Sequence, residues 1–442
     1  MSCRRFRFIC RARVPLMLLA IISAVMVIFT VAQLFWQNQQ QSLPPLSVKP
    51  SPPLTSTLSI SNKSKLKIIL YWSSWSWKMG DQPLIKAKCP VTACLFTPDL
   101  TLFNQSDVVV LSVETTPDFL VNRLPHQRFV FFVMESPANT VDIPMLRNNR
   151  TRYNYFNWTM SYRRDSDIVL RDFLGAVVSK NNSNDQYPPR FETNVSRRRQ
   201  YNGNTTRKLS SVEALKLLVT TREDRRRRAD QNPFVDESRH YPWIKSKTKL
   251  VAWFVSHCDT PIQREEYARQ LGQHIPVDIY GRCGKEQQVT SICDSADDPA
   301  NCEEIRALRA QYKFYLAFEN SWCPDYVTEK FYRTLQFDTV PIVLGGAEYD
   351  RFAPPHSFIN ALDFSSPKQL AEYLLLLNSS EELYAGYFQW KNHYRVSLPA
   401  MDGWCDLCRM AHDETLPAKV YPDIKQWWID DGPCENDRTN YF

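Results

Sequence analysis

Short, strongly apolar segments recur in two separate parts of the chain. Such runs, spaced by longer stretches, are typical of strands buried on both faces of a parallel sheet. The segments are KIILYW (67–72), DVVVLSV (107–113) and RFVFFVME (128–135) in the first part, and LVAWFVS (250–256), VDIYG (277–281), KFYLAFE (313–319) and VPIVLGG (340–346) in the second. A helix is expected over 327–337, between the last two. The pattern predicts two α/β domains, the second Rossmann-like.

The N-terminal region carries an apolar segment of a different kind. Residues 16–35 contain no charged side chain, and a helix of that length crosses a bilayer core of about 30 Å. A cleaved signal peptide has a shorter apolar core, of about 7–15 residues, so we favour a spanning signal-anchor at 16–36. Five arginines precede it. They predict a cytosolic tail at 1–15 and a single-pass type II protein with a lumenal catalytic part.

Charge and composition divide the rest of the chain. The net charge of +7 does not indicate a nucleic-acid partner, because the five N-terminal arginines supply most of it. Residues 37–65 are rich in Gln, Pro and Ser and are predicted to form a flexible stem. An N-terminal α/β domain is expected at 66–179 and the Rossmann-like domain at 246–400. Between them, 180–245 is polar, with runs of arginine, and is interpreted as an insertion or interdomain segment.

Two further features agree with lumenal exposure. Ten of the 12 cysteines lie beyond the anchor, an even number suited to disulfides in an oxidising compartment. Cys405 and Cys408 could form half of a zinc site, but no second CxxC or histidine pair completes a ligand set, so disulfides are favoured. The N-glycosylation pattern occurs at Asn62, Asn104, Asn157, Asn181, Asn194, Asn204 and Asn378.

The densest candidate chemistry lies between Lys313 and Gly346. An apolar strand ends at Glu319, and a helix that begins near Thr328 carries Lys330 in its first turn. The free amides of a helix N-terminus and a nearby lysine both favour negative charge. The segment is therefore a candidate diphosphate site, while composition by itself favours an ordinary solvated helix face for Glu329 and Lys330.

The same segment resembles the signature of the α1,3/α1,4-fucosyltransferase family. FENS (318–321), DYVTEK (325–330) and PIVLG (341–345) occur in the order of that signature. MESP (134–137) and FNWTMSYRRDSDI (156–168) are similar to the family's acceptor-side domain. The resemblance extends from about residue 66 to about 409 and omits the stem and the segment from about 180 to 241. It implies two Rossmann-like domains of the GT-B type and an inverting enzyme of the Golgi membrane.

The resemblance also implies partners and donor-site residues. The donor would be GDP-β-L-fucose, and the acceptor O3 of a GlcNAc in a glycoprotein glycan, with no cofactor required and a divalent metal at most stimulatory. Arg264 and Lys330 would bind the diphosphate, where cations stabilise the charge of the leaving group. Asn320, Tyr326 and Glu329 would contact the nucleotide sugar.

The family pattern implies a general base and a disulfide pairing as well. Glu135 ends an apolar strand and matches the proposed base, and we expect burial to raise its pKa. Cys89 would pair with Cys405 and Cys94 with Cys408. These bonds would fold the C-terminal segment, 401–442, back onto the N-terminal domain.

Two other functions stay open from the sequence. Asp165 and Asp167 form a DxD pattern that could hold a metal on a sugar diphosphate, although pairing with Arg163 or Arg164 is favoured because no apolar strand ends there. A catalytically silent glycan-binding membrane protein is the second alternative. The acceptor, either the innermost GlcNAc of an N-glycan or an antennal GlcNAc, and the oligomeric state are not predicted.

Overall fold

The computed structural model describes residues 66–72, 80–112, 122–170, 175–180, 241–284, 310–397, 402–432 and 434–435. All of them belong to one compact unit, Ser64–Phe442. The expected tail, anchor and stem lie outside the described residues, as does nearly all of the expected insertion at 180–245. Within the described part of the chain, no helix is both long and apolar enough to cross a membrane.

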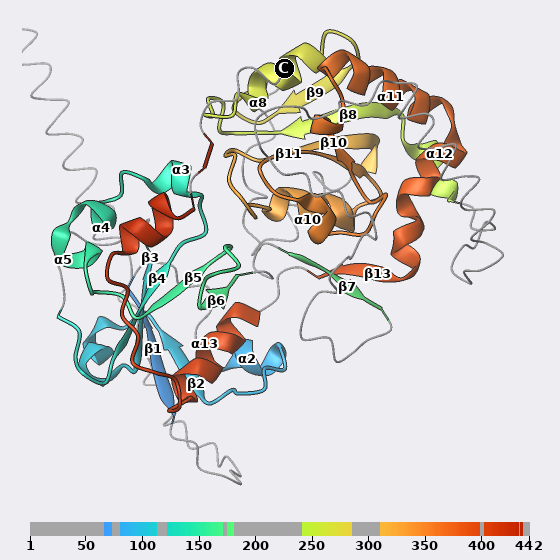
Figure 1. Ribbon diagram of the computed structural model, residues 1–442. Coiled ribbons are helices and arrows are strands. Elements are labelled where there is room, and N and C mark those ends of the chain that lie inside the picture. The colour runs from blue at the N-terminus through green and yellow to red at the C-terminus, as the bar shows by residue number, and fades with distance from the viewer. Residues whose placement is uncertain are drawn as a thin grey trace, which may run out of the picture. The chain divides into compact units, whose positions relative to one another are not determined.

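The first sheet is parallel, with its described strands in the order β2-β1-β3-β4-β5-β6 (Figure 1). All five residues of β3 are buried, and successive side chains point to opposite faces, so both faces are covered. Helices α2 and α13 pack on one face, and α4 packs on the other together with residues 421–428. The bounds are β1 (Lys67–Tyr71), α2 (Gln82–Lys86), β2 (Cys94–Thr97), η1 (Leu100–Gln105), β3 (Val108–Ser112), β4 (Arg128–Phe132), α3 (Pro137–Thr140), α4 (Pro144–Arg147), α5 (Asn149–Arg152), β5 (Trp158–Ser161) and β6 (Ile168–Val169).

The second sheet is also parallel, in the order β12-β11-β10-β8-β9. Helices α8 and α11 cover one face and lie beside each other, whereas α10 covers the other face. The bounds are η2 (Pro242–Ser246), β8 (Lys249–Phe254), α8 (Arg264–Leu271), β9 (Val277–Tyr280), β10 (Tyr312–Phe318), α10 (Glu329–Gln336), β11 (Val340–Leu344), η4 (Tyr349–Arg351), β12 (Ile359–Asn360), η5 (Ala361–Asp363), α11 (Pro367–Ser379), α12 (Glu381–Ala385) and η6 (Gly386–Asn392). A separate antiparallel pair joins β7 (Ala176–Ser179) to β13 (Tyr394–Ser397).

The prediction of an α/β protein with parallel sheets is confirmed. Each of the seven predicted strands is present, as is the helix that follows Thr328. Strands β2, β5, β6, β7, β12 and β13 were not predicted. Each has only two to four residues, too few to show an apolar periodicity of its own, so pairing with neighbouring strands defines them.

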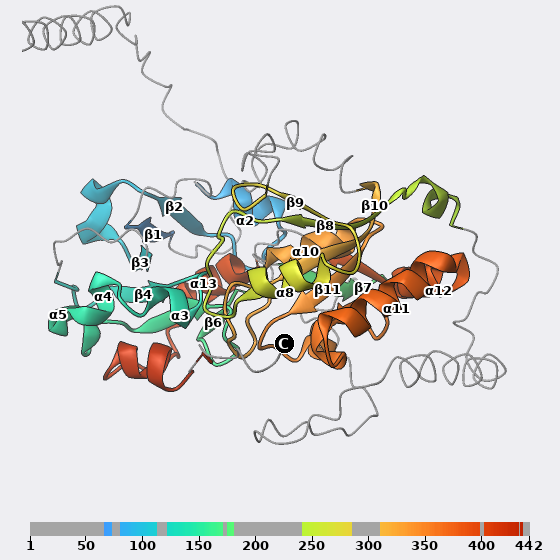
Figure 2. The same cartoon turned by 90° about the horizontal axis from the view of Figure 1, so that it is seen from above.

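The C-terminal segment returns to the first sheet. Helix α13 (Asp402–His412) lies beside β1 and β6 of the first sheet (Figures 1 and 2). The ring of Trp404 packs edge-on against Tyr71 and Phe96, with centroids 5.3 and 5.9 Å away. Disulfides join Cys89 to Cys405 and Cys94 to Cys408, which is the pairing that the resemblance implied.

Candidate active site

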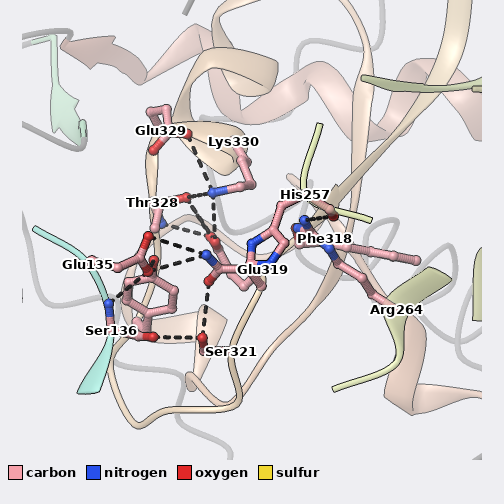
Figure 3. Close-up of polar contacts among 12 residues, drawn as sticks. Glu135, Ser136, His257, Arg264, Phe318, Glu319, Ser321, Thr328, Glu329 and Lys330 are labelled. Carbon is pink, nitrogen blue, oxygen red and sulfur yellow. Dashed lines mark hydrogen bonds and ion pairs between the residues drawn. The ribbon is translucent and has the colours of Figure 1, made fainter. Parts of the chain in front are cut away.

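Glu135 lies just beyond the C-terminal end of β4, at the edge of a parallel sheet where ligands usually bind. Its Oε1 accepts hydrogen bonds from the Ser136 backbone N–H at 2.8 Å and from Asn139 Nδ2 at 3.0 Å. Two residues that follow β10 donate to the same oxygen: Asn320 Nδ2 at 3.2 Å and the Tyr326 hydroxyl at 2.7 Å. Figure 3 shows Glu135 near the segment that follows β10, in which Ser321 and Thr328 are labelled.

These hydrogen bonds correct the expected pKa of Glu135. Burial raises the pKa, as expected, but the hydrogen bonds from Ser136, Tyr326, Asn139 and Asn320 favour the charged form and outweigh it. The pKa therefore lies below that of an ordinary glutamate, and the carboxylate is ionised at neutral pH. Among the described residues, Oε2 has one donor in range, Asn320 Nδ2 at 3.4 Å, so this oxygen keeps capacity for a substrate proton.

Tyr326 is buried, with 2% of its surface exposed. Its hydroxyl donates to Glu135, and its ring lies edge-on to that of Tyr162, 4.9 Å between centroids. The preceding Asp325 has a positive φ of 60° and forms an ion pair with Arg164 at 2.8 Å. The resemblance implied that Tyr326 contacts the nucleotide sugar, which stays a prediction; in the structure its hydroxyl donates to the Glu135 carboxylate.

Lys330 lies in the first turn of α10, where the helix dipole favours negative charge. Its ammonium contacts Thr328 Oγ1 at 2.9 Å, Glu319 Oε2 at 3.3 Å and Glu329 Oε1 at 3.4 Å (Figure 3). Burial lowers the pKa of Lys330, but the carboxylates of Glu319 and Glu329 outweigh it and raise the pKa above its usual value. The ammonium is therefore a permanent cation at this helix end.

Glu319 is the acid that holds this cation. It is fully buried, and its carboxylate accepts from the Thr328 backbone N–H at 2.8 Å and from the Thr328 hydroxyl at 2.8 and 3.0 Å. Burial raises the pKa of Glu319 against the opposing effect of Lys330. With no exposed surface, Glu319 orients Lys330 and the first turn of α10 and is not accessible to an acceptor.

Arg264 is the first residue of α8 and is buried, with 3% of its surface exposed. Its guanidinium donates to the Phe318 carbonyl at 2.7 Å and to the His257 carbonyl at 3.1 Å. Nε has no hydrogen-bond partner among the described residues. Two of its five N–H donors therefore fix backbone beside Glu319, and the buried Nε is among the donors left for an anion.

The two sheet edges meet in direct hydrogen bonds. Ser136, the N-cap of α3, and Ser321, which follows β10, have hydroxyl oxygens 2.6 Å apart. Asn139 Nδ2 also donates to Ser321 Oγ at 3.3 Å. The structure thus brings Glu135, Asn320, Tyr326 and Lys330 into one site, with Arg264 bonded to the strand end that leads into it. Analysis of the sequence missed Asn139, Ser321 and Tyr162, whose roles depend on contacts made across the two sheets.

The two aspartates of the DxD pattern are engaged by protein cations. Both carboxylate oxygens of Asp165 bind the guanidinium of Arg163, at 2.6 and 2.8 Å. Asp167 is bound by the ammonium of Lys419 at 2.7 Å and accepts from the Tyr421 hydroxyl at 2.8 Å. This pairing agrees with the structural role favoured for Asp165 and gives the metal-site alternative no free carboxylate.

The prediction that Asn157 is glycosylated is wrong for this fold, because its side chain is not accessible. The side chain is buried, accepts a hydrogen bond from the Phe129 N–H at 2.8 Å and donates to the Lys419 carbonyl at 2.9 Å. Asn104 and Asn378 are exposed, so those two stay predictions. The other predicted glycosylation sites lie outside the described residues: Asn62, Asn181, Asn194 and Asn204.

Two further disulfides bind segments near the site. Cys258 pairs with Cys283, and Cys323 pairs with Cys434. The sequence had left both pairings open. Because Cys405 and Cys408 are also in disulfides, neither offers the thiolate that a zinc site would need.

Comparisons with known proteins agree with this architecture. A model of the fucosyltransferase N-terminal domain matches residues 64–172, and one of the glycosyltransferase family 10 (fucosyltransferase) C-terminal domain matches 244–427. Alpha-(1,3)-fucosyltransferase C of Drosophila melanogaster is 33% identical over 390 residues, 82% of this chain and 78% of that protein. Glycoprotein 3-alpha-L-fucosyltransferase A of the same organism is 34% identical over 386 residues, 85% of this chain and 63% of that protein. The chain belongs to glycosyltransferase family 10, the fucosyltransferases.

A solved structure, an alpha1,3-fucosyltransferase with GDP-fucose, aligns with 82% of this chain and 96% of its own at 16% identity and a TM-score of 0.44. The family models leave residues 173–243 unmatched, a range that contains the whole segment from about 180 to 241 that the sequence resemblance also omitted.

Proposed function

We propose that the protein is an inverting α1,3-fucosyltransferase that transfers L-fucose from GDP-β-L-fucose to O3 of a GlcNAc in glycoprotein glycans. Family membership and the names of the Drosophila relatives support the reaction class. The observation that carries the assignment is the ionised Glu135, held by Asn320 and Tyr326 from the other sheet beside the Lys330 cation.

The site suits a single displacement at the anomeric carbon. Glu135 Oε2 takes the proton from the acceptor hydroxyl as that oxygen forms its bond to fucose C1. The bond from C1 to the diphosphate breaks on the opposite side, and its electron pair leaves with GDP, so the β donor gives an α product. Lys330 and the Nε of Arg264 stabilise the charge that develops on the diphosphate. Glu329 flanks Lys330 and would contact the nucleotide sugar.

The wider arrangement is part of the proposal. We assign each parallel sheet to one Rossmann-like domain of a GT-B enzyme, the first binding acceptor and the second GDP-fucose. The apolar segment 16–36 and the disulfides support a type II protein of the Golgi membrane. Immunofluorescence of the full chain should show Golgi staining, and uniform staining of the endoplasmic reticulum would contradict it.

Transfer by the detergent-solubilised full chain tests the reaction. GDP-fucose is supplied with two defined acceptors, an N-glycan with a free core GlcNAc and an N-acetyllactosamine chain, and the product linkage is read by mass spectrometry. We expect α1,3-linked fucose on one of them, unchanged by EDTA, and no transfer from GDP-mannose. Acceptor binding without transfer would instead identify the silent glycan-binding alternative, and loss of activity in EDTA would favour a metal-dependent enzyme.

A further inference from the structure

The last described residues of the chain, 421–432 and 434–435, connect the two halves of the site, and we call them the strap. Its final residues extend past residue 427, where the family match ends. The strap includes the helical turn η7 (Gln426–Asp430) and Cys434, which pairs with Cys323.

One end of the strap is anchored behind Glu135. The side chain of Trp428 is fully buried, and its Nε1 donates to the Thr140 hydroxyl at 2.8 Å. Thr140 Oγ1 in turn donates to the Ser136 carbonyl at 2.8 Å, in the residue next to Glu135. The guanidinium of Arg163 lies 4.6 Å from the Trp427 ring centroid and donates to the Trp427 carbonyl at 2.5 Å.

The other end is anchored to the turn that supplies Asn320 and Tyr326. Cys434 is bonded to Cys323, which lies between those two residues in sequence. The Glu435 N–H donates to the Trp322 carbonyl at 2.8 Å, so backbone pairing reinforces the covalent bond. This turn therefore cannot move away from the strap without breaking both.

A chain of ring contacts joins the two ends. The Trp428 ring lies 5.9 Å from Tyr162, whose ring lies 4.9 Å from Tyr326, and the Tyr326 hydroxyl donates to Glu135. We propose that the strap positions the general base, with Trp428 and the Cys323–Cys434 disulfide keeping the Tyr326 hydroxyl against Glu135. These are positioning residues that do not touch the reacting atoms. The inference rests on the proposed function, which assigns Glu135 as the base.

The acid limb of kcat/KM against pH reports this contact, because losing the Tyr326 hydrogen bond would raise the pKa of Glu135. Among the described residues, the titratable groups that face Glu135 are Tyr326, Tyr162 and Lys330, and none of these changes charge at acid pH. The hydrogen-bond and ion-pair partners of Glu319 are Thr328 and Lys330, which lie outside the strap. Changes in the strap should therefore leave the pKa of Glu319 as it is.

The test uses the full chain with Cys323→Ala/Cys434→Ala. We expect kcat to fall about tenfold or more and the acid limb to move up by about one pH unit, the size of one hydrogen bond to a charged group. The affinity for GDP should stay unchanged, because Lys330 and Arg264 are untouched. The matched control, Cys258→Ala/Cys283→Ala, also lacks one disulfide but should leave the acid limb in place.

Trp428→Phe is the second variant, which keeps an aromatic ring and removes the hydrogen bond to Thr140 together with part of the buried indole. It should shift the acid limb in the same direction, and it decides the matter if the disulfide variant does not fold. A wild-type acid limb in the folded variants, with or without a fall in kcat, overturns the positioning role. Absence of fucose transfer by the wild-type chain overturns the proposed function instead.

Discussion

Replacing Glu135 with glutamine tests the base in the most direct way, because the structure indicates what the change removes. Oε1 accepts all four of the shorter hydrogen bonds, and the carbonyl oxygen of an amide can keep them. The amide nitrogen would replace Oε2, whose one hydrogen bond within the described part of the chain is the 3.4 Å contact with Asn320. Shape and local bonding are thus retained, while the proton acceptor is lost. General-base removal then predicts a loss in kcat of at least about a hundredfold.

The assay measures initial rates of fucose transfer at saturating donor, with GDP affinity by calorimetry and thermal unfolding as folding controls. GDP should bind Glu135→Gln normally, since Lys330 is unaffected. Glu348→Gln, which alters a surface ion pair with Arg351, should have wild-type activity. Transfer near the wild-type rate by folded Glu135→Gln would refute the assignment.

The depressed pKa of Glu135 gives a second expectation from the same side chain. A group whose folded pKa is lowered stays ionised as the pH falls and is protonated only below its ordinary value, about 4.3 for glutamate. In the folded enzyme, kcat/KM should therefore stay level from neutral pH down to about 5. An acid limb of kcat/KM centred near pH 6 would show that the effect of burial on the pKa of Glu135 outweighs that of the hydrogen bonds.

Four more substitutions probe the rest of the site and the fold. Lys330→Ala and Arg264→Ala should each weaken GDP binding about tenfold to a hundredfold in calorimetry and abolish most transfer, and wild-type affinity would contradict the diphosphate assignment. Arg264→Ala should also lower Tm, since two backbone carbonyls lose their donor. Asp165→Asn should keep transfer within about threefold in the presence of EDTA, because the Asp165 carboxylate itself is exposed to solvent, whereas a metal-dependent loss would revive the DxD alternative. Mass spectrometry should find Asn157 unglycosylated, and Asn157→Ala should lower the free energy of unfolding by about 1–3 kcal/mol because the buried Phe129 N–H loses its acceptor.

The strongest predictions came from segments whose own residues specify their structure. Segments such as RFVFFVME and KFYLAFE are apolar at every position between their charged ends, so burial in a parallel sheet is the favourable state of those inner residues. The polar residues that follow them, Glu135 and Asn320, then had to lie at the carboxyl edges of the sheets. The helix after Thr328 and its lysine could be predicted for the same local reason.

Tertiary structure alone decided how those edges combine. No local pattern shows that Tyr326 is buried with its hydroxyl on Glu135, because the contact joins residues 191 positions apart. The pKa of Glu135 was predicted in the wrong direction, since burial can be inferred from an apolar strand but the donors that outweigh it come from other elements. The same holds for Asn157, whose sequon is local while its hydrogen bonds to Phe129 and Lys419 are not. The sequence by itself determined the buried strands and the residue types at their ends, because these depend on neighbouring residues; the state of each side chain depends on long-range packing and was settled only by the fold.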